Sequence, residues 1–299
     1  MENLIRVLQK EFQSGGAVIK ENISMSEYTS FKTGGTAAVG VFPENELAAA
    51  RAVRIMQDKK YVVLGNGSNV IFPDNGYNGA VLFTTSMKCV EVQDNIITAQ
   101  CGAGITGIAA TAFKCSLSGL EFAYGIPGTA GGAVYMNAGA YDGEMSQVVQ
   151  SSTCILPDGT LKTVVGEEHE FSYRRSVYTD GNKVITGCKM FLKSGDTAAI
   201  KAKMDENMFK RRDKQPLEYP SAGSVFKRPP GTFAGKLISD CGLKGYTVGG
   251  AQVSEKHAGF IINAGGAKSD DILRLIEHIK SEVLRQFGVQ LECEVRYIC

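Results

Sequence analysis

The chain has 299 residues, which is long for a single hydrophobic core and favours two domains. Its formal net charge is +1, which excludes a general electrostatic attraction to nucleic acid or to an anionic membrane surface. The eight cysteines show no C-x-x-C spacing and lie at no zinc-ligand spacing from a histidine, so we expect the reduced thiols of a cytoplasmic protein and no metal site.

The N-terminal region is predicted to alternate between helices and strands. Leu4, Ile5, Leu8 and Phe12 recur at helical spacing, which predicts an amphipathic helix rather than a signal peptide. No apolar run is long enough to span a bilayer. The next elements are predicted over residues 38–42 (strand), 44–60 (helix) and 61–64 (strand).

The loop GNGSN, residues 65–69, follows the predicted strand 61–64 directly. A strand followed by G-x-G is typical of the dinucleotide turn of Rossmann folds, but that turn needs a third glycine and a helix that opens at the loop. Residues 70–73 read VIFP, which favours a strand and then a break. The loop therefore predicts a phosphate-binding turn between two strands, in which Ser68 and Asn69 supply donors.

The stretch from Glu121 to Tyr141 reads EFAYGIPGTAGGAVYMNAGAY and contains no lysine or arginine. Small residues at this density allow a backbone to approach a large ligand closely, and successive amides can point together at an anion. We expect Pro127-Gly128-Thr129 to start a helix whose N-terminal amides face such an anion. The alternative is a tightly packed turn of a glycine-rich core.

The rest of the chain is predicted to contain short strands and a few helices. Strands are predicted over residues 79–84, 89–92, 95–101, 150–156, 161–165, 183–192, 260–262 and 289–298, and helices over 105–114, 197–214, 231–241 and 270–287. Ser269 suits the N-cap of the last helix, and Gly288 suits its end. Glu294 and Arg296 share one face of the last strand, which is typical of a structural salt bridge or of a carboxylate held for acid–base chemistry.

Two further segments carry polar side chains that function could use. FSYRRSVY, residues 171–178, places Arg174 and Arg175 in either a partly buried arginine site or an exposed pair. PSAGSVFKRPP, residues 220–230, carries Ser224, but there is no G-x-S-x-G elbow and no nearby histidine, which disfavours a serine-hydrolase nucleophile. The basic helix over 197–214 is either a solvated face or a surface that holds a phosphorylated substrate.

These motifs together resemble the UDP-N-acetylenolpyruvoylglucosamine reductase family over nearly the whole chain. GNGSN, GIPGTAGGAVYMNAGAY, Tyr173-Arg174-x-Ser176 and AGSVFK occur in the order of that family. The resemblance implies an α+β fold. Its first part, residues 1–195, is an FAD-binding domain of the vanillyl-alcohol oxidase or cresol methylhydroxylase type with two subdomains split near residues 70–80. A substrate-binding α+β domain follows over residues 196–299.

The resemblance also implies an activity. The family is cytoplasmic and uses NADPH and non-covalent FAD to reduce UDP-N-acetylglucosamine enolpyruvate to UDP-N-acetylmuramate in peptidoglycan precursor synthesis. Hydride passes from FAD N5 to C3 of the enolpyruvyl group, and a proton passes to C2. No protein partner, nucleic acid or membrane is expected. The alternatives are another flavoenzyme of this fold that acts on a sugar or a phenol, and a catalytically silent nucleotide-binding module.

The site residues of the family carry over to matching positions of this chain. Arg174 and Glu294 are the implied stabilisers of developing negative charge, which reverses the preference for a salt bridge at Glu294, and Ser224 is the implied proton donor. The implied substrate-binding residues are Tyr173, Lys227, Arg228 and Arg296. The implied FAD-binding residues are Gly65, Asn66, Gly67, Ser68, Asn69, Gly125, Ile126, Pro127, Gly128, Thr129, Gly132, Asn137, Ala138, Gly139 and Ala140. The chain resembles the shorter type of the family, because residues 174–224 leave no room for a tyrosine-bearing insertion.

Overall fold

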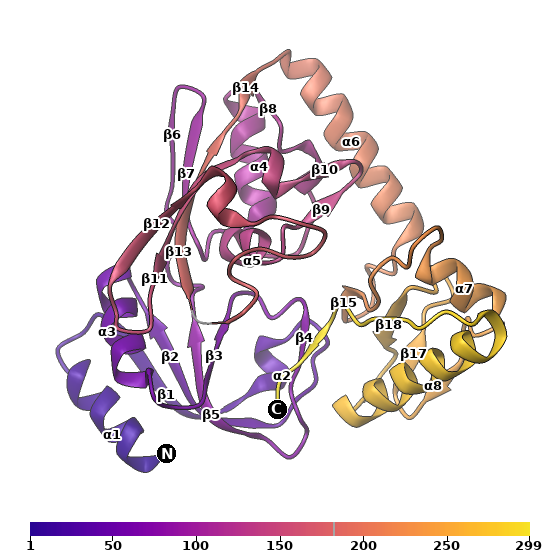
Figure 1. Ribbon diagram of the computed structural model, residues 1–299, viewed down its shortest axis with the longest axis horizontal. Coiled ribbons are helices and arrows are strands. Elements are labelled where there is room, and N and C mark those ends of the chain that lie inside the picture. The colour runs from indigo at the N-terminus through magenta and orange to yellow at the C-terminus, as the bar shows by residue number, and fades with distance from the viewer. Residues whose placement is uncertain (182) are drawn as a thin grey trace. The chain divides into compact units, whose positions relative to one another are not determined.

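The structure is a computed structural model that describes residues 1–181 and 183–299, and Figure 1 labels its elements. The chain folds into two compact units. The larger unit comprises residues 1–22, 38–66 and 78–210, and the smaller unit comprises residues 23–37, 67–77 and 211–299. Each unit is therefore assembled from three separate stretches of chain. The predicted boundary between an FAD-binding and a substrate-binding domain at residues 195/196 stays a prediction.

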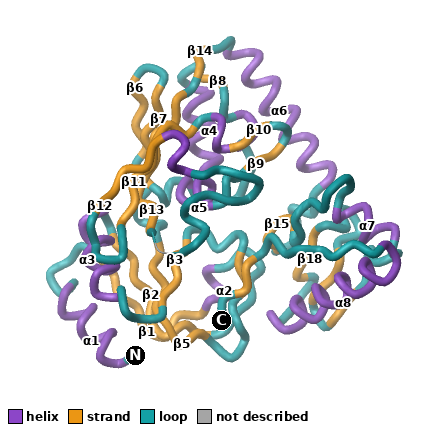
Figure 2. The backbone as a smooth tube through the Cα atoms, viewed as in Figure 1, coloured by secondary structure: helices purple, strands orange, loops and turns teal. Residues whose placement is uncertain are grey.

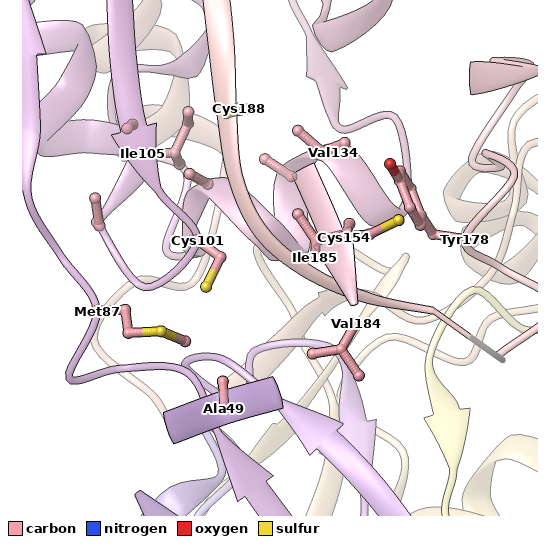
Figure 3. Close-up of a cluster of buried hydrophobic side chains, with 14 of the residues drawn as sticks. Ala49, Met87, Cys101, Ile105, Val134, Cys154, Tyr178, Val184, Ile185 and Cys188 are labelled. Carbon is pink, nitrogen blue, oxygen red and sulfur yellow. The ribbon is translucent and has the colours of Figure 1, made fainter. Parts of the chain in front are cut away.

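A five-stranded antiparallel sheet forms the centre of the larger unit, with the strand order β12-β11-β13-β7-β6. Its strands are β12 (Leu161–Val165), β11 (Val149–Ile155), β13 (Val184–Phe191), β7 (Ile96–Gln100) and β6 (Val90–Gln93). Helix α5 (Ala130–Tyr135) packs against β13 and β7. Figure 3 shows part of the buried cluster, to which α5 contributes Val134 and β13 contributes Ile185 and Cys188.

A second sheet has four strands in the order β1-β2-β5-β3, and its β3 and β5 run parallel. Its strands are β1 (Ala17–Ser24), β2 (Thr36–Pro43), β5 (Tyr77–Phe83) and β3 (Tyr61–Leu64). Helices α1 (Glu2–Glu11) and α3 (Glu46–Met56) pack against each other in the same core, where Leu8 and Val53 are fully buried. The side chain of Asn45 caps α3 by accepting a hydrogen bond of 2.9 Å from the amide of Ala48.

The smaller unit has its own antiparallel sheet, in the order β15-β18-β17-β16. Its strands are β15 (Ser221–Ser224), β18 (Phe260–Asn263), β17 (Ala251–Val253) and β16 (Thr247–Val248). Helix α8 (Ser269–Phe287) packs against β16, β17 and helix α7 (Ala234–Asp240). The apolar face of α8, which includes Leu275 and Ile279, is fully buried and forms the core of this unit.

The remaining elements are short, apart from helices α4 and α6, and long loops join them (Figure 2). The helices are α2 (Met25–Tyr28), α4 (Ile105–Lys114) and α6 (Thr197–Lys214), with 3₁₀ turns at Glu121–Ala123, Met145–Gln147 and Gly166–His169. The paired short strands are β8 (Leu117–Ser118) with β14 (Lys193–Ser194), β9 (Gly139–Ala140) with β10 (Gly143–Glu144), and β4 (Val70–Ile71) with β19 (Arg296–Tyr297). Over the described ranges, no helix is both long and apolar enough to cross a membrane, and no cluster of three metal-ligating side chains is present.

Most predicted elements are confirmed, and several match to the residue. The strands 61–64 and 161–165 and the helices 105–114 and 197–214 have their predicted bounds, and α8 begins one residue earlier than predicted. Residue Gly288 ends α8 in the left-handed conformation with φ +67°, as expected. The helix predicted after Pro127-Gly128-Thr129 is also present, and the mixed composition confirms the α+β fold.

Three details of the prediction are wrong. The strand predicted over 289–298 is reduced to Arg296–Tyr297, because this extended segment first bonds to Val225 and then to β4, so that neither pairing grows into a long ladder. Ser269 is the first residue of α8 and not its N-cap, because Asp74 accepts from the Ser269 amide at 2.9 Å. Residues 220–230, for which no strand was predicted, contain strand β15.

Candidate functional site

In the larger unit, the start of the GNGSN loop lies against the glycine-rich stretch. A Cβ built on Gly65 would overlap Oγ1 of Thr129 and would lie 3.2 Å from its Cγ2, so only glycine allows this approach. The side-chain amide of Asn66 donates to the carbonyl of Pro127 at 3.5 Å. Two segments that are about sixty residues apart in the chain therefore form one turn-lined surface.

The first amides of α5 are used within the chain. The amide of Ala130 donates to the carbonyl of Ala103, and that of Gly131 donates to the carbonyl of Cys101, each at 2.8 Å. The amide of Gly132 donates to Thr129 Oγ1 at 3.3 Å. The expectation that these helix amides face an anion is therefore wrong. The amides of Gly128 and Thr129 have no acceptor among the described residues, so any backbone binding of an anion falls to the turn before the helix.

Thr106 of α4 supports the same turn and was not identified from the sequence. Its Oγ1 donates to the carbonyl of Ile126 at 3.0 Å and accepts from the amide of Gly125 at 3.1 Å. Gly125 has φ +91°, which glycine adopts without strain. The only sequence signal for Thr106 was its position just after the G-A-G turn that opens α4.

Arg174 lies at the tip of a tight turn. Ser172 and Arg175 exchange two backbone hydrogen bonds of 3.1 Å, and Arg174 between them has φ +57°, which is uncommon for a residue other than glycine. Its Nη2 donates to the carbonyl of Gly139 at 3.1 Å, and its guanidinium carbon lies 5.5 Å from the centre of the Tyr173 ring. Arg174 is half-buried, which fits the interpretation as a partly buried arginine site.

The neighbouring Arg175 has a different environment. It is exposed, and it forms an ion pair with Asp180 at 3.5 Å. Exposed pairs of this kind contribute little to stability. Of the two adjacent arginines, Arg174 is thus the one that the fold holds in a defined place.

Asn137 connects the glycine-rich stretch to the Arg174 turn. It is buried and has φ +45°. Its Nδ2 donates to the carbonyl of Ser172 at 3.1 Å, and its Oδ1 accepts from the amide of Ser146 at 2.9 Å. Both ends of the side-chain amide are therefore engaged within the protein.

A buried polar network supports the other end of the arginine segment. Ser152 Oγ lies 2.8 Å from His169 Nε2 and 2.7 Å from the Tyr178 hydroxyl, and all three residues are at most 1 % exposed. His169 Nδ1 donates to the carbonyl of Gly166 at 2.9 Å, and burial lowers the pKa of His169. The network joins β11, the 3₁₀ turn at Gly166–His169 and the segment that carries Arg174 through buried hydrogen bonds.

In the smaller unit, Ser224 and Glu294 belong to neighbouring segments. The register of β15 on β18 shifts between Ser221 and Ser224, and Gly223 within this bulge has φ +75°. The carbonyl of Val225 accepts from the amide of Glu294 at 2.7 Å. Both predicted catalytic residues of this unit are half-buried, which leaves each side chain partly accessible.

Asn69 also contacts the Glu294 segment. Its Nδ2 donates to the carbonyl of Glu294 at 3.1 Å, and its own carbonyl accepts from the amide of Arg296 at 3.1 Å. Gly67 is equally constrained, since a Cβ there would overlap the carbonyl of Tyr28. The last part of the GNGSN loop and the predicted catalytic glutamate are therefore fixed to each other.

The predicted substrate-binding residues of the smaller unit lie nearer the surface. Lys227 forms an ion pair with Glu292, and the Arg228 guanidinium lies 4.4 Å from the centre of the Phe233 ring. Arg228 and Arg296 are exposed. These positions are compatible with a ligand reaching them from solvent.

Comparison with known proteins matches two sequence models to this chain. Residues 37–165 match the FAD binding domain, and residues 215–298 match the C-terminal domain of UDP-N-acetylenolpyruvoylglucosamine reductase. These matches confirm the two predicted domain types in their predicted order. The boundary at 195/196 lies between them and is not reached by either, so it stays a prediction.

The curated relatives are similar over almost their whole length. The chain is 49% identical to UDP-N-acetylenolpyruvoylglucosamine reductase of Pediococcus pentosaceus, with 94% of both chains covered. It is 48% identical to the reductase of Clostridium novyi, with 94% of this chain and 92% of the relative covered. The crystal structure of the reductase from Thermus caldophilus superposes with a TM-score of 0.83 at 32% identity, covering 95% of this chain and 100% of that one.

Proposed function

The chain belongs to the UDP-N-acetylenolpyruvoylglucosamine reductase family, and on that premise we propose how its residues carry out the reaction. It is an FAD-containing enzyme that uses NADPH to reduce UDP-N-acetylglucosamine enolpyruvate in peptidoglycan precursor synthesis. The observation that carries this assignment is the 49% identity to a reductase over 94% of the chain. The substrates are small molecules, and the proposed location is the cytoplasm, as the resemblance to the family implies.

The turn-lined surface of the larger unit fits FAD. It has no lysine or arginine between residues 115 and 161, so a diphosphate would be held by backbone amides such as those of Gly128 and Thr129. The close approach of Gly65 to Thr129 leaves no room for a side chain at position 65. FAD, once reduced by NADPH, would supply the hydride.

The proposed FAD-binding residues are those of two loops. In the first loop they are Gly65, Asn66, Gly67, Ser68 and Asn69, and in the second they are Gly125, Ile126, Pro127, Gly128, Thr129, Gly132, Asn137, Ala138, Gly139 and Ala140. The contacts above support backbone roles for Gly65 and Gly67, since neither position accepts a side chain. Asn137 contributes through its backbone, because its side chain is already engaged.

Arg174 is the proposed electrostatic stabiliser. Negative charge develops on the enolpyruvyl carboxylate as hydride arrives at C3, and a fixed guanidinium stabilises that charge without having to reorganise. The tight turn and the bond to Gly139 hold Arg174 in place before substrate binds. Removal of such a donor costs about 3–4 kcal/mol of transition-state stabilisation. Tyr173, which stacks on the guanidinium, would contact the substrate beside it.

Ser224 is the proposed proton donor to C2, and Glu294 is the proposed second stabiliser. The amide of Glu294 donates to the carbonyl of Val225 and its carbonyl accepts from the side chain of Asn69, so the backbone that carries the carboxyl group is held at both of its polar atoms. The bulge at Gly223 aims the end of β15, where Ser224 lies. Lys227, Arg228 and Arg296 are proposed to bind the anionic groups of the sugar nucleotide.

An anaerobic two-step experiment tests this function. The purified enzyme is reduced by NADPH, UDP-N-acetylglucosamine enolpyruvate is added, and the flavin absorbance and product are followed. We expect rapid reoxidation with formation of UDP-N-acetylmuramate. A flavin that NADPH reduces but that this substrate leaves reduced would show a flavoenzyme with a different substrate, and the assigned reaction would be wrong.

A further inference from the structure

The place of Arg174 is set by one short segment of the glycine-rich stretch, residues 137–139. The carbonyl of Gly139 accepts from the guanidinium, and the side chain of Asn137 donates to the carbonyl of Ser172 at the base of the arginine turn. The segment therefore touches both the charged end of Arg174 and the backbone that carries it. No other residue type offers the same donor and acceptor from a side chain of this size.

The backbone of Asn137 explains why it can reach both partners. Its φ of +45° lies in the left-handed region, which asparagine tolerates better than most residues. Two residues later, a Cβ on Gly139 would lie 2.8 Å from the carbonyl of Gly143, so the chain there runs too close for a side chain. The bend at Asn137 thus brings the Gly139 carbonyl to the guanidinium while the amide side chain turns to Ser172.

The side chain of Asn137 is buried and engaged at both ends, which leaves almost no surface for a direct contact with a ligand. Its Oδ1 is used by the Ser146 amide and its Nδ2 by the Ser172 carbonyl, and the residue is 1% exposed. Any influence of this side chain on the reaction would have to act through these partners. Of these two partners, the Ser172 carbonyl belongs to the turn that carries Arg174, and it is therefore the one through which Asn137 can affect the reaction.

We propose that Asn137 is a positioning residue for Arg174, which it holds through the Ser172 carbonyl. The inference rests on the proposed role of Arg174 and goes beyond the assignment of Asn137 to the FAD-binding loop. Without the amide donor, the left-handed turn at Arg174 loses the contact that fixes its base. The guanidinium then samples positions away from the developing charge, while the flavin site keeps its backbone.

The test compares the two half-reactions in Asn137→Asp. In its ionised form, aspartate keeps the acceptor for Ser146 but presents a second acceptor to Ser172 in place of the donor. We expect FAD content and reduction by NADPH to stay within about threefold of the wild type, and reoxidation by the enolpyruvyl substrate to slow by about 10- to 100-fold. A role confined to folding would not separate the two steps in this way.

Asn207→Asp is the matched control. Asn207 is also 1% exposed in the larger unit, and its Nδ2 donates to the carbonyl of Glu121 at 3.1 Å, as that of Asn137 does to Ser172. We expect this variant to keep both half-reactions at wild-type rates. Equal slowing in both variants would mean that any lost buried amide bond slows the enzyme, and the proposal would be wrong.

A double variant separates this proposal from the proposed function. In an Arg174→Ala background, Asn137→Asp should slow reoxidation by less than about twofold further, since the two act as one unit. If the two substitutions slow reoxidation by fully additive amounts of free energy, the positioning role is wrong. Fast reoxidation in Arg174→Ala alone refutes the role of Arg174 itself. If Asn137→Asp and Asn137→Gly both fail to retain FAD, Asn137 serves the cofactor or the fold, and the inference also fails.

Discussion

The contact between Gly65 and Thr129 predicts that the GNGSN loop tolerates no side chain at its first position. In Gly65→Ala, the new Cβ would overlap Thr129 Oγ1 and lie 3.2 Å and 3.4 Å from Cγ2 and Cβ of that side chain. Thr129 is 2% exposed, so it has little room to move away. The overlap must therefore be relieved by a shift of the loop or by rotation of the threonine.

Both routes have a cost that can be worked out. Overpacking of a filled site costs about 1–3 kcal/mol. Rotation of Thr129 also breaks its bond with the Gly132 amide, and loss of such an N-cap costs about 1 kcal/mol. We expect Gly65→Ala to lower the free energy of unfolding by about 2–3 kcal/mol. We also expect Gly65→Ala to weaken FAD binding. If half or more of this cost falls on the loop in its FAD-binding position, the affinity drops by about tenfold or more, since about 1.4 kcal/mol corresponds to a factor of ten.

The assays are urea unfolding of the apoprotein and titration of FAD by its fluorescence. Gly107→Ala is the control, since Gly107 lies in α4 and nothing is within 4 Å of its built Cβ. Alanine there should be neutral or stabilise by about 0.5–1 kcal/mol. Adding Thr129→Ala to Gly65→Ala should recover part of the loss, because the overlapping Oγ1 is gone. If Gly65→Ala behaves like Gly107→Ala in both assays, the close packing of these loops is not as described.

Two further predictions concern titrating groups. The amide of Lys268 donates to Asp271, and this hydrogen bond is the main cause that lowers the pKa of the Asp271 carboxyl from 3.8. The ionised carboxylate therefore contributes its full stabilisation of the fold above pH 3.8. This contribution is lost as the pH falls through the lower pKa of the folded state. The unfolding free energy of wild type should therefore fall more steeply in acid than that of Asp271→Asn, and parallel acid profiles would contradict this. Burial raises the pKa of the Cys101 and Cys188 thiols to about 12, whereas Cys89 is exposed. Iodoacetamide near neutral pH should label Cys89 in the native protein and reach the other two only after denaturation, as mass spectrometry would show.

Sequence periodicity predicted the helices and strands whose stability comes from one well-defined face. Helix α8 is the clearest case, because its apolar residues recur at helical spacing and pack into one core. Its N-cap could not be predicted in the same way. The capping carboxylate belongs to Asp74, which is 195 residues away from Ser269 in the chain.

For the C-terminal segment, the sequence predicted more regular structure than is present. Alternation over residues 289–298 indicated an extended backbone, and Leu291 and Val295 are indeed buried. The pattern reports which side chains are buried, but it does not report what the backbone bonds to. Here the backbone bonds first to Val225 and then to the β4 segment, so the ladder is interrupted.

The residues of the candidate site fall into two groups, those that the sequence identified and those that it did not. Sequence motifs identified Gly65, Arg174 and Ser224, because each of these residues lies in a short segment with an unusual composition. The supporting residues were not marked, since Ser152, His169 and Tyr178 are ordinary residues on separate elements that only the fold brings together. A hydrogen-bond network between distant segments leaves no local pattern in a single sequence.

The glycine-rich stretch therefore has two tasks that favour the same composition. Its first half forms the turn before α5, where the amides of Gly128 and Thr129 find no acceptor within residues 1–181 and 183–299 and Gly65 can approach. Its second half, residues 137–139, carries the turn of Arg174 through one side-chain amide and one carbonyl. A substitution in the first half should change the affinity for FAD, whereas one in the second half should change the rate of flavin reoxidation by substrate. Because a single short helix, α5, joins the two halves, the fold couples the place of the cofactor to the place of the cation that acts on the substrate.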